Sequence, residues 1–146
     1  MNASARTGVI GPGGGRHVPV GPNRLVVKVG PEHGGRLFAM FESVLPPGAG
    51  VFVHAHRTCE EAFYVLEGEI EYRLGEERVV ARTGTSIVVP TGVVHGFKNL
   101  GSGDARHLVT VAPPVALEMI EALGQAGPEH FAAVLARYDS DFIGPY

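Results

Sequence analysis

The sequence has few of the features that mark secreted or membrane proteins. It contains one cysteine in 146 residues, so an intramolecular disulfide is impossible, which is typical of a reducing compartment. It has no run of about 18 apolar residues that would span a membrane. The N-terminal segment has no apolar stretch of the kind found in signal peptides. These absences predict a cytoplasmic protein that does not associate with membranes.

Strong charge of either sign is also missing. Twelve Lys and Arg residues face fifteen Asp and Glu residues, and the formal net charge is −3. No run of basic residues interrupts this balance. Nucleic-acid-binding surfaces need clustered Lys and Arg, so we expect no nucleic-acid partner.

Glycine and proline, in contrast, are plentiful. The 21 Gly and 11 Pro residues indicate many turns, and many turns suit short strands better than long helices. The chain length fits one domain with a substantial core. Several short segments rich in β-branched and aromatic residues follow one another between turn signals, which predicts an all-β sandwich or barrel. The expected strands are Arg24–Gly30, Arg36–Leu45, Val51–His56, Glu61–Leu66, Glu69–Leu74, Arg78–Arg82, Ser86–Val89, Val93–Phe97 and Arg106–Ala112.

The two ends of the chain differ from this pattern. Residues 1–23 are rich in Gly and Pro and lack periodicity, so we expect a flexible arm, or else a segment that packs across the barrel mouth or a partner subunit. After residue 112, Val115–Leu123 and Glu129–Tyr138 have helical apolar spacing, with Gly124 and Pro128 at the expected boundaries. We therefore expect an arm (1–23), a barrel (24–112) and a helical segment (113–146) of the same domain.

Histidine and glutamate residues form a metal-ligand pattern. His54 and His56 are two residues apart in a predicted strand, so both imidazoles lie on one face. Glu60 or Glu61 follows and supplies an oxygen donor, and His95 begins another strand. Three imidazoles and one carboxylate suit one divalent transition metal (Fe, Mn, Ni, Co, Cu or Zn) and suit Mg or Ca poorly.

Two segments around these residues resemble the sequence motifs of the cupin superfamily. Gly48–Gly68 reads GAGVFVHAHRTCEEAFYVLEG, and Gly84–Asn99 reads GTSIVVPTGVVHGFKN. All ten motif positions agree in identity and spacing. They are Gly48, His54, His56, Glu61, Gly68, Gly84, Pro90, Gly92, His95 and Asn99. The fifteen residues between the motifs match the short spacing of small single-domain cupins.

This resemblance implies a jelly-roll β-barrel in which His54, His56, Glu61 and His95 are the metal ligands. It selects Glu61 over Glu60, and strand parity agrees, because Glu61, Phe63 and Val65 share a face. Glu61 is also the expected catalytic group, as a general base in an apolar surround. Gly68 is expected to let the strand bend or shift register. Cupins of this size often pair, so we expect a homodimer.

Residues 35–145 are similar, more broadly, to quercetin 2,3-dioxygenase-like small cupins. This implies a metal-dependent dioxygenase that takes dioxygen and a small enolic or aromatic substrate. Two alternatives remain. One is a non-oxidative cyclase or isomerase of secondary metabolism, of the polyketide type. The other is a metal-assisted binding protein without turnover, because a fold alone does not define function.

Other candidate residues carry weaker signals. Cys59 is expected to be an ordinary free thiol. Glu42 interrupts an apolar strand and is expected to face outward, with a place in the pocket as the alternative. The remaining histidines have no ligand spacing and are expected to be solvated or structural. They are His17, His33, His107 and His130.

Overall fold

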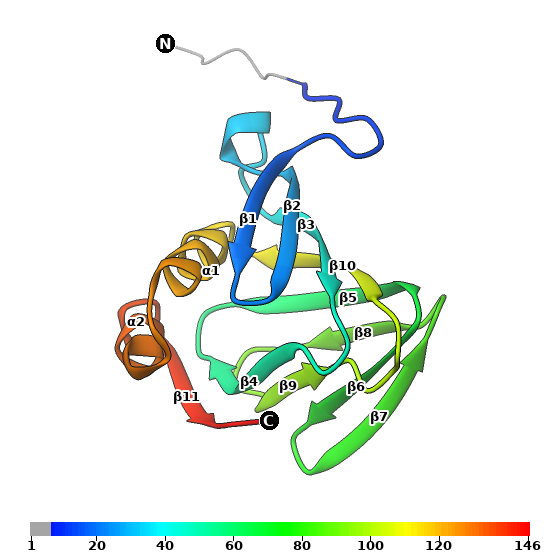
Figure 1. Cartoon of the computed structure of the whole chain (residues 1–146). Helices are drawn as coiled ribbons and strands as arrows, with labels where there is room; N and C mark the ends of the chain where they lie inside the picture. Colours follow the sequence, from blue (N-terminus) through cyan, green and yellow to red (C-terminus); the bar gives the residue numbers. More distant parts are fainter. Residues whose placement is uncertain (1–6) are drawn as a thin grey trace.

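The structure is a computed structural model that describes residues 7–146; the first six residues of the predicted arm lie outside the described residues. Two antiparallel sheets form a jelly-roll barrel (Figure 1). One has the order β1-β2-β3-β10-β5-β8 and the other β11-β4-β9-β6-β7. The strands are β1 (Arg16–Val20), β2 (Asn23–Val29), β3 (Ala39–Leu45), β4 (Gly50–His56), β5 (Glu60–Glu67), β6 (Glu69–Leu74), β7 (Glu77–Arg82), β8 (Ser86–Val89), β9 (His95–Lys98), β10 (Ala105–Ala112) and β11 (Ser140–Gly144).

The predicted all-β fold is confirmed, and each predicted strand is present with small changes at its ends. The largest change is in β3, which begins at Ala39 and not at Arg36. Three strands carry the metal-site candidates. β4 lies between β11 and β9, β9 lies between β4 and β6, and β5 lies between β10 and β8. All three are therefore interior strands, hydrogen-bonded on both edges.

Gly68 is where the chain passes from one sheet to the other. β5 ends at Glu67 in the six-stranded sheet, and β6 begins at Glu69 in the five-stranded sheet. Gly68 has a φ of 76°, a left-handed conformation that glycine adopts without steric cost. The change of sheet at this residue lets Glu61 on β5 and the buried Ile70 on β6 both point into the barrel. The prediction of a bend at Gly68 is confirmed.

Residues 16–20 are a strand, although the sequence placed them in an arm. β1 pairs with β2 through a two-residue turn, in which Gly21 has a φ of 56° and Pro22 follows. This order of positive φ and then proline suits a hairpin turn. The sequence reading missed β1 because Pro19 breaks the strand pattern. Proline is accepted here because β1 is at the edge of its sheet. The predicted boundary at residue 23 therefore does not coincide with the first strand.

The C-terminal segment contains the two predicted helices and one strand that was not predicted. Helix α1 spans Val115–Gln125, and a short 3₁₀ turn at Pro128–His130 leads into α2 (Phe131–Arg137). α1 packs beside β1, and α2 packs beside β11 (Figure 1). β11 then returns along β4 and completes the five-stranded sheet. Within residues 7–146, no helix is long and apolar enough to cross a membrane.

The barrel interior contains one main apolar core and a smaller cluster beneath the helices. Leu45, Val65, Ile70 and Val111 are completely buried in the main core. Each such side chain contributes about 1.5–3 kcal/mol of transfer free energy. Met119, Leu123, Val134 and Leu135 form the second cluster. This cluster fixes the helices over one end of the barrel, next to the candidate site.

Candidate metal centre

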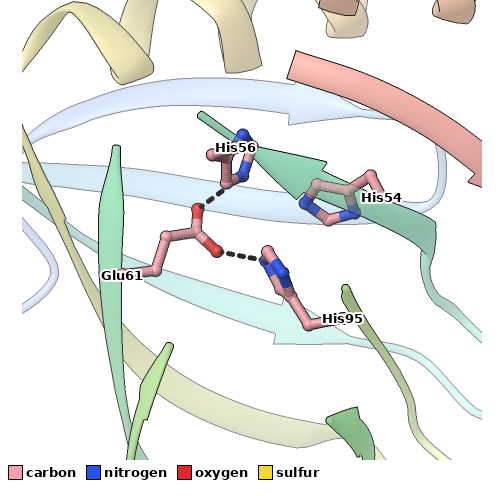
Figure 2. Close-up of side chains that lie close together, drawn as sticks. All are labelled: His54, His56, Glu61 and His95. Atoms are coloured by element: carbon pink, nitrogen blue, oxygen red, sulfur yellow. Dashed lines mark hydrogen bonds and ion pairs between the residues drawn. The ribbon is translucent and has the colours of Figure 1, made fainter. Parts of the chain in front are cut away.

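Four buried side chains meet inside the barrel, as Figure 2 shows: His54 and His56 from β4, Glu61 from β5 and His95 from β9. One ligand atom from each residue lies within 4.8 Å of the others. His54 and His95 are direct cross-strand partners. The histidines belong to one sheet and the glutamate to the other, so the cluster joins the two walls of the barrel. The sequence prediction that these four residues converge is confirmed.

The two adjacent glutamates point in opposite directions. Glu60 is exposed, whereas Glu61 is buried together with Phe63 and Val65 on the same face of β5. Alternation along a strand separates neighbours in this way. The choice of Glu61 over Glu60 therefore agrees with the structure.

The Nδ1 atom of each histidine in the cluster is engaged by a hydrogen bond on the side away from the centre. His54 Nδ1 lies 2.8 Å from the carbonyl oxygen of Phe52, and His95 Nδ1 lies 2.9 Å from that of Val93. A carbonyl oxygen only accepts hydrogen bonds, so both Nδ1 atoms carry the proton. In the neutral rings, the Nε2 lone pairs then face inward, as metal ligation requires.

Ser140 on β11 accepts the hydrogen bond from Nδ1 of the third histidine, His56. Its hydroxyl donates to the carbonyl oxygen of Tyr138 at 3.0 Å. The Ser140 oxygen is therefore free to accept from His56 Nδ1, which lies at 2.7 Å. Sequence reasoning missed Ser140, because nothing near it in the chain identifies it. The pairing of β11 with β4 is what brings the two residues together.

Glu61 and His95 form a close pair that needs a positive charge. His95 Nε2 lies 2.9 Å from Glu61 Oε2. With Nδ1 already protonated, Nε2 and the carboxylate would place two lone pairs against each other unless a proton or a metal ion lies between them. Burial alone would lower the pKa of His95, but the hydrogen bond and the charge of Glu61 outweigh burial and raise that pKa.

Burial and charge also determine the protonation of the other cluster residues. Burial would raise the pKa of Glu61, yet its interactions with His56 and His95 hold that pKa well below the usual range. His54 has its pKa lowered to about 3, first by burial and then by the neighbouring His95 and His56. Glu61 is thus a carboxylate and His54 a neutral imidazole near neutral pH, which are the ligand forms that a metal takes.

The donor set fits a transition metal. Three imidazole nitrogens and one carboxylate oxygen suit Fe, Mn, Co, Ni, Cu or Zn. His56 Nε2 is buried and has no hydrogen-bond partner among the described residues. It lies 3.6 Å from Glu61 Oε1. An unpaired buried nitrogen is costly, and a bound cation would satisfy it. The four residues could therefore hold one metal ion.

A cavity of about 170 Å³ borders the cluster. His54 and Glu61 form part of its wall, and most of the rest is apolar, including Phe41, Phe63 and Phe97. Residues of α1 and α2 and the turn between β1 and β2 also contribute. A cavity of about 150 Å³ holds one benzene ring. The space beside the cluster is thus about the size of one aromatic ring.

The remaining candidates lie in different places. Glu42 faces away from this cavity and pairs with Arg106 at 3.3 Å, in agreement with the expectation that it faces outward. Cys59 is a free thiol, and burial raises its pKa to about 12. His17 and His130 are exposed, and His33 is half-buried. His107 is buried and borders the cavity, a position that its spacing in the sequence did not indicate.

Fold and site together define a class: a jelly-roll barrel with a buried three-histidine, one-glutamate cluster beside an apolar cavity. Comparison with protein families matches residues 41–111 to the family described as a cupin domain. The chain belongs to the cupin superfamily.

The names of individual relatives refer to different functions. The chain is 32% identical over 82 residues to polyketide synthase CurC of Streptomyces cyaneus, covering 54% of this chain and 53% of that protein. It is 30% identical over 87 residues to an oxalate-binding protein of Thermotoga maritima, covering 60% and 70%. An RmlC-like cupin from Shewanella frigidimarina superposes with a TM-score of 0.62 at 22% identity, covering 75% and 94%. The region aligned with CurC covers about half of the length of CurC.

Proposed function

We propose that this cupin is a metal-dependent enzyme that acts on a small enolic or aromatic compound, with a quercetinase-like dioxygenase as the leading assignment. The observation that carries this proposal is the position of the cluster at the wall of an apolar cavity, where His54 and Glu61 border the space. A purely structural metal site would be closed by protein ligands and packed side chains. Here a small molecule would reach the ligand residues directly.

The cavity wall favours a flat, apolar substrate with an ionisable oxygen. Phe41, Phe63 and Phe97 offer ring faces and edges against which an aromatic or enolic plane can stack. A bound metal would supply a Lewis acid for the substrate oxygen and a meeting point for dioxygen. Glu61 is a buried carboxylate at the cavity wall and is the group proposed to accept the proton of the substrate hydroxyl. The apolar surround was expected to raise its pKa for this role, whereas its interactions with His56 and His95 hold that pKa well below the usual range.

Cavity size limits which part of a substrate is enclosed. About 170 Å³ accommodates one ring. A three-ring flavonol would place one ring near the cluster and extend the others toward the helices. A single-ring enol would fit entirely. Small enols therefore belong in the substrate panel beside flavonols.

Two other functions have a specific observation in their favour. The relative named as a polyketide synthase supports a non-oxidative cyclase or isomerase. The relative named as an oxalate-binding protein supports metal-assisted binding without turnover. All three functions would use the same four ligand residues. Only a measurement of oxygen uptake and of product can therefore distinguish them.

The experiment is oxygen uptake by protein reconstituted separately with Fe, Ni, Co and Mn. The panel contains quercetin, 3-hydroxyflavone and the single-ring enol 1,3-cyclohexanedione. Dioxygenase activity predicts stoichiometric oxygen consumption and cleaved product with at least one metal, and no consumption by Glu61→Gln. Product formation without oxygen uptake would instead support a cyclase or isomerase. Binding without any product would support the third function, and no uptake in any combination would refute the dioxygenase.

A further inference from the structure

His107 borders the same cavity as the metal cluster but is not part of it. It lies on β10, in the six-stranded sheet, and its side chain is completely buried. Its ring packs edge-to-face on Phe97, with 4.9 Å between ring centroids, and beside Phe63 at 5.4 Å. A polar ring in this apolar wall needs a partner for each of its nitrogens.

One nitrogen has its partner on the side away from the cavity. The Tyr72 hydroxyl lies 2.6 Å from His107 Nδ1. Tyr72 is buried and does not border the cavity, whereas His107 does. Tyr72 therefore covers the Nδ1 edge of the ring, and Nε2, which is buried in this structure, is the ring nitrogen left to meet a ligand in the cavity.

Tyr72 also determines which nitrogen carries the proton. Burial raises the pKa of the Tyr72 phenol, so it keeps its proton. Among the described residues, His107 Nδ1 is the one hydrogen-bond partner of this hydroxyl, so the buried O–H is satisfied only if it donates to Nδ1, which makes Nδ1 the acceptor. Burial lowers the pKa of His107 to about 3, so the ring is neutral with a single N–H. That N–H is on Nε2.

Nε2 has no hydrogen-bond partner among the described residues. A buried donor without an acceptor destabilises the fold. The strand pairing is also irregular here, because the register of β10 against β5 shifts between Arg106 and His107. Such bulges often redirect a side chain next to a functional site.

We propose that His107 Nε2–H is a substrate-binding donor that hydrogen-bonds a carbonyl oxygen of the ligand, while a second oxygen of the same ligand is bound at the metal cluster. The assignment rests on the proposed function and narrows it. The ligand class becomes hydroxy-carbonyl compounds with two oxygens on one small planar framework. A ligand with a single oxygen would leave the His107 donor unpaired and would bind less tightly.

Binding of simple phenols to zinc-loaded protein tests this directly, because zinc supports no redox turnover. Phenol carries one oxygen, and 3- and 4-hydroxyacetophenone add a carbonyl at two different distances from the hydroxyl. Calorimetry gives the three dissociation constants. We expect at least one hydroxyacetophenone to bind the natural protein about 2- to 12-fold more tightly than phenol, the value of one neutral hydrogen bond.

Three variants assign any preference to His107. His107→Phe keeps an aromatic ring between Phe63 and Phe97 and removes the donor, so the preference for the ketone should disappear while phenol binds within about twofold of the natural protein. His107→Gln retains an N–H donor and should keep part of the preference. Val109→Ala enlarges the same cavity wall without changing a polar group, so it should affect phenol and the ketones alike.

The outcomes separate this inference from the proposed function. If phenol binds but neither ketone binds more tightly, or if the preference survives in His107→Phe, the role of His107 is overturned and the metal site is unaffected. If none of the three compounds binds the zinc-loaded protein, the proposed function fails and the inference fails with it. Elemental analysis of each variant, with one zinc per chain as the requirement, keeps loss of metal distinct from loss of the hydrogen bond.

Discussion

Ser140 Oγ lies 2.7 Å from His56 Nδ1, although 84 residues separate the two in the chain. They are also direct cross-strand partners, since β11 pairs with β4 at this point. The serine hydroxyl in turn donates to the Tyr138 carbonyl. The last strand of the barrel therefore controls both the orientation and the tautomer of a metal-site histidine.

Removing the Ser140 hydroxyl should weaken metal binding without unfolding the barrel. Losing a hydrogen-bond partner of a ligating histidine usually costs about 10–100-fold in metal affinity, and we expect that range for Ser140→Ala in zinc competition with a chelator. Asp141→Asn is the matched control, because Asp141 points outward and pairs with Arg57 at the surface. Equal affinities for Ser140→Ala and the natural protein would contradict the role of Ser140.

Glu61 and Glu60 offer a paired test of the carboxylate ligand. Glu61→Gln removes the charge from the buried cluster and should lower zinc affinity at least tenfold, whereas Glu60→Gln changes an exposed residue and should leave it unaltered. Elemental analysis after dialysis against a weak chelator measures both. If the two variants retain the same metal content, Glu61 is not a ligand.

Acid should destabilise the metal-free protein in part through His107. The unfolded chain takes up a proton near pH 6.5, but native His107, with its pKa lowered to about 3, does not. The unfolded state then binds more protons, so the free energy of unfolding falls as the pH drops from 6.5 toward 3, by up to about 1.4 kcal/mol per pH unit. Urea unfolding at pH 6.5, 5.5 and 4.5 should show a shallower decline for His107→Gln. Identical slopes would show that His107 does not resist protonation.

Cys59 should be nearly inert in the native protein. Its pKa of about 12 leaves about one thiol in ten thousand ionised at pH 8, and the thiolate is the reactive form. Alkylation by iodoacetamide, followed by mass spectrometry, should be at least about 100-fold slower in the native protein than in urea. Equal rates would place the thiol in contact with solvent.

We also expect a homodimer in solution. Tyr64 on β5 and Val88 on β8 lie on the outer face of the six-stranded sheet, with exposed fractions of 46% and 67%. Exposed apolar side chains that adjoin one another are typical of interfaces. Light scattering should give twice the chain mass, and Val88→Lys should shift the mass toward that of one chain. A monomer at every concentration would refute the pairing.

The metal cluster could be predicted because the cupin motifs are local sequence patterns. The resemblance to these motifs assigned His54, His56, Glu61 and His95 as ligands, and strand parity agreed with the choice of Glu61. Ser140 and His107 could not be predicted in the same way. Their roles depend on partners far away in the chain, Ser140 on His56 and His107 on Tyr72, and no local periodicity encodes such contacts.

The same contrast holds for the fold. The alternating apolar pattern and the turn residues predicted the central strands, because burial on one face determines that pattern. β1 and β11 were missed, although the other two edge strands, β7 and β8, were predicted. β1 contains Pro19, and β11 has a single buried residue, Ser140, so neither shows an alternating apolar pattern. The neighbouring strand, and not propensity, determined both.

Every residue of the metal cluster lies on a strand that is hydrogen-bonded on both edges. Local opening of a sheet begins at its outer strands, where amide protons exchange with solvent first. The ligand strands β4, β5 and β9 should therefore be among the slowest to exchange, with or without metal. Folding, rather than the ion, arranges the ligands, so metal should bind to a preformed site in one step and leave the exchange pattern of the barrel almost unchanged.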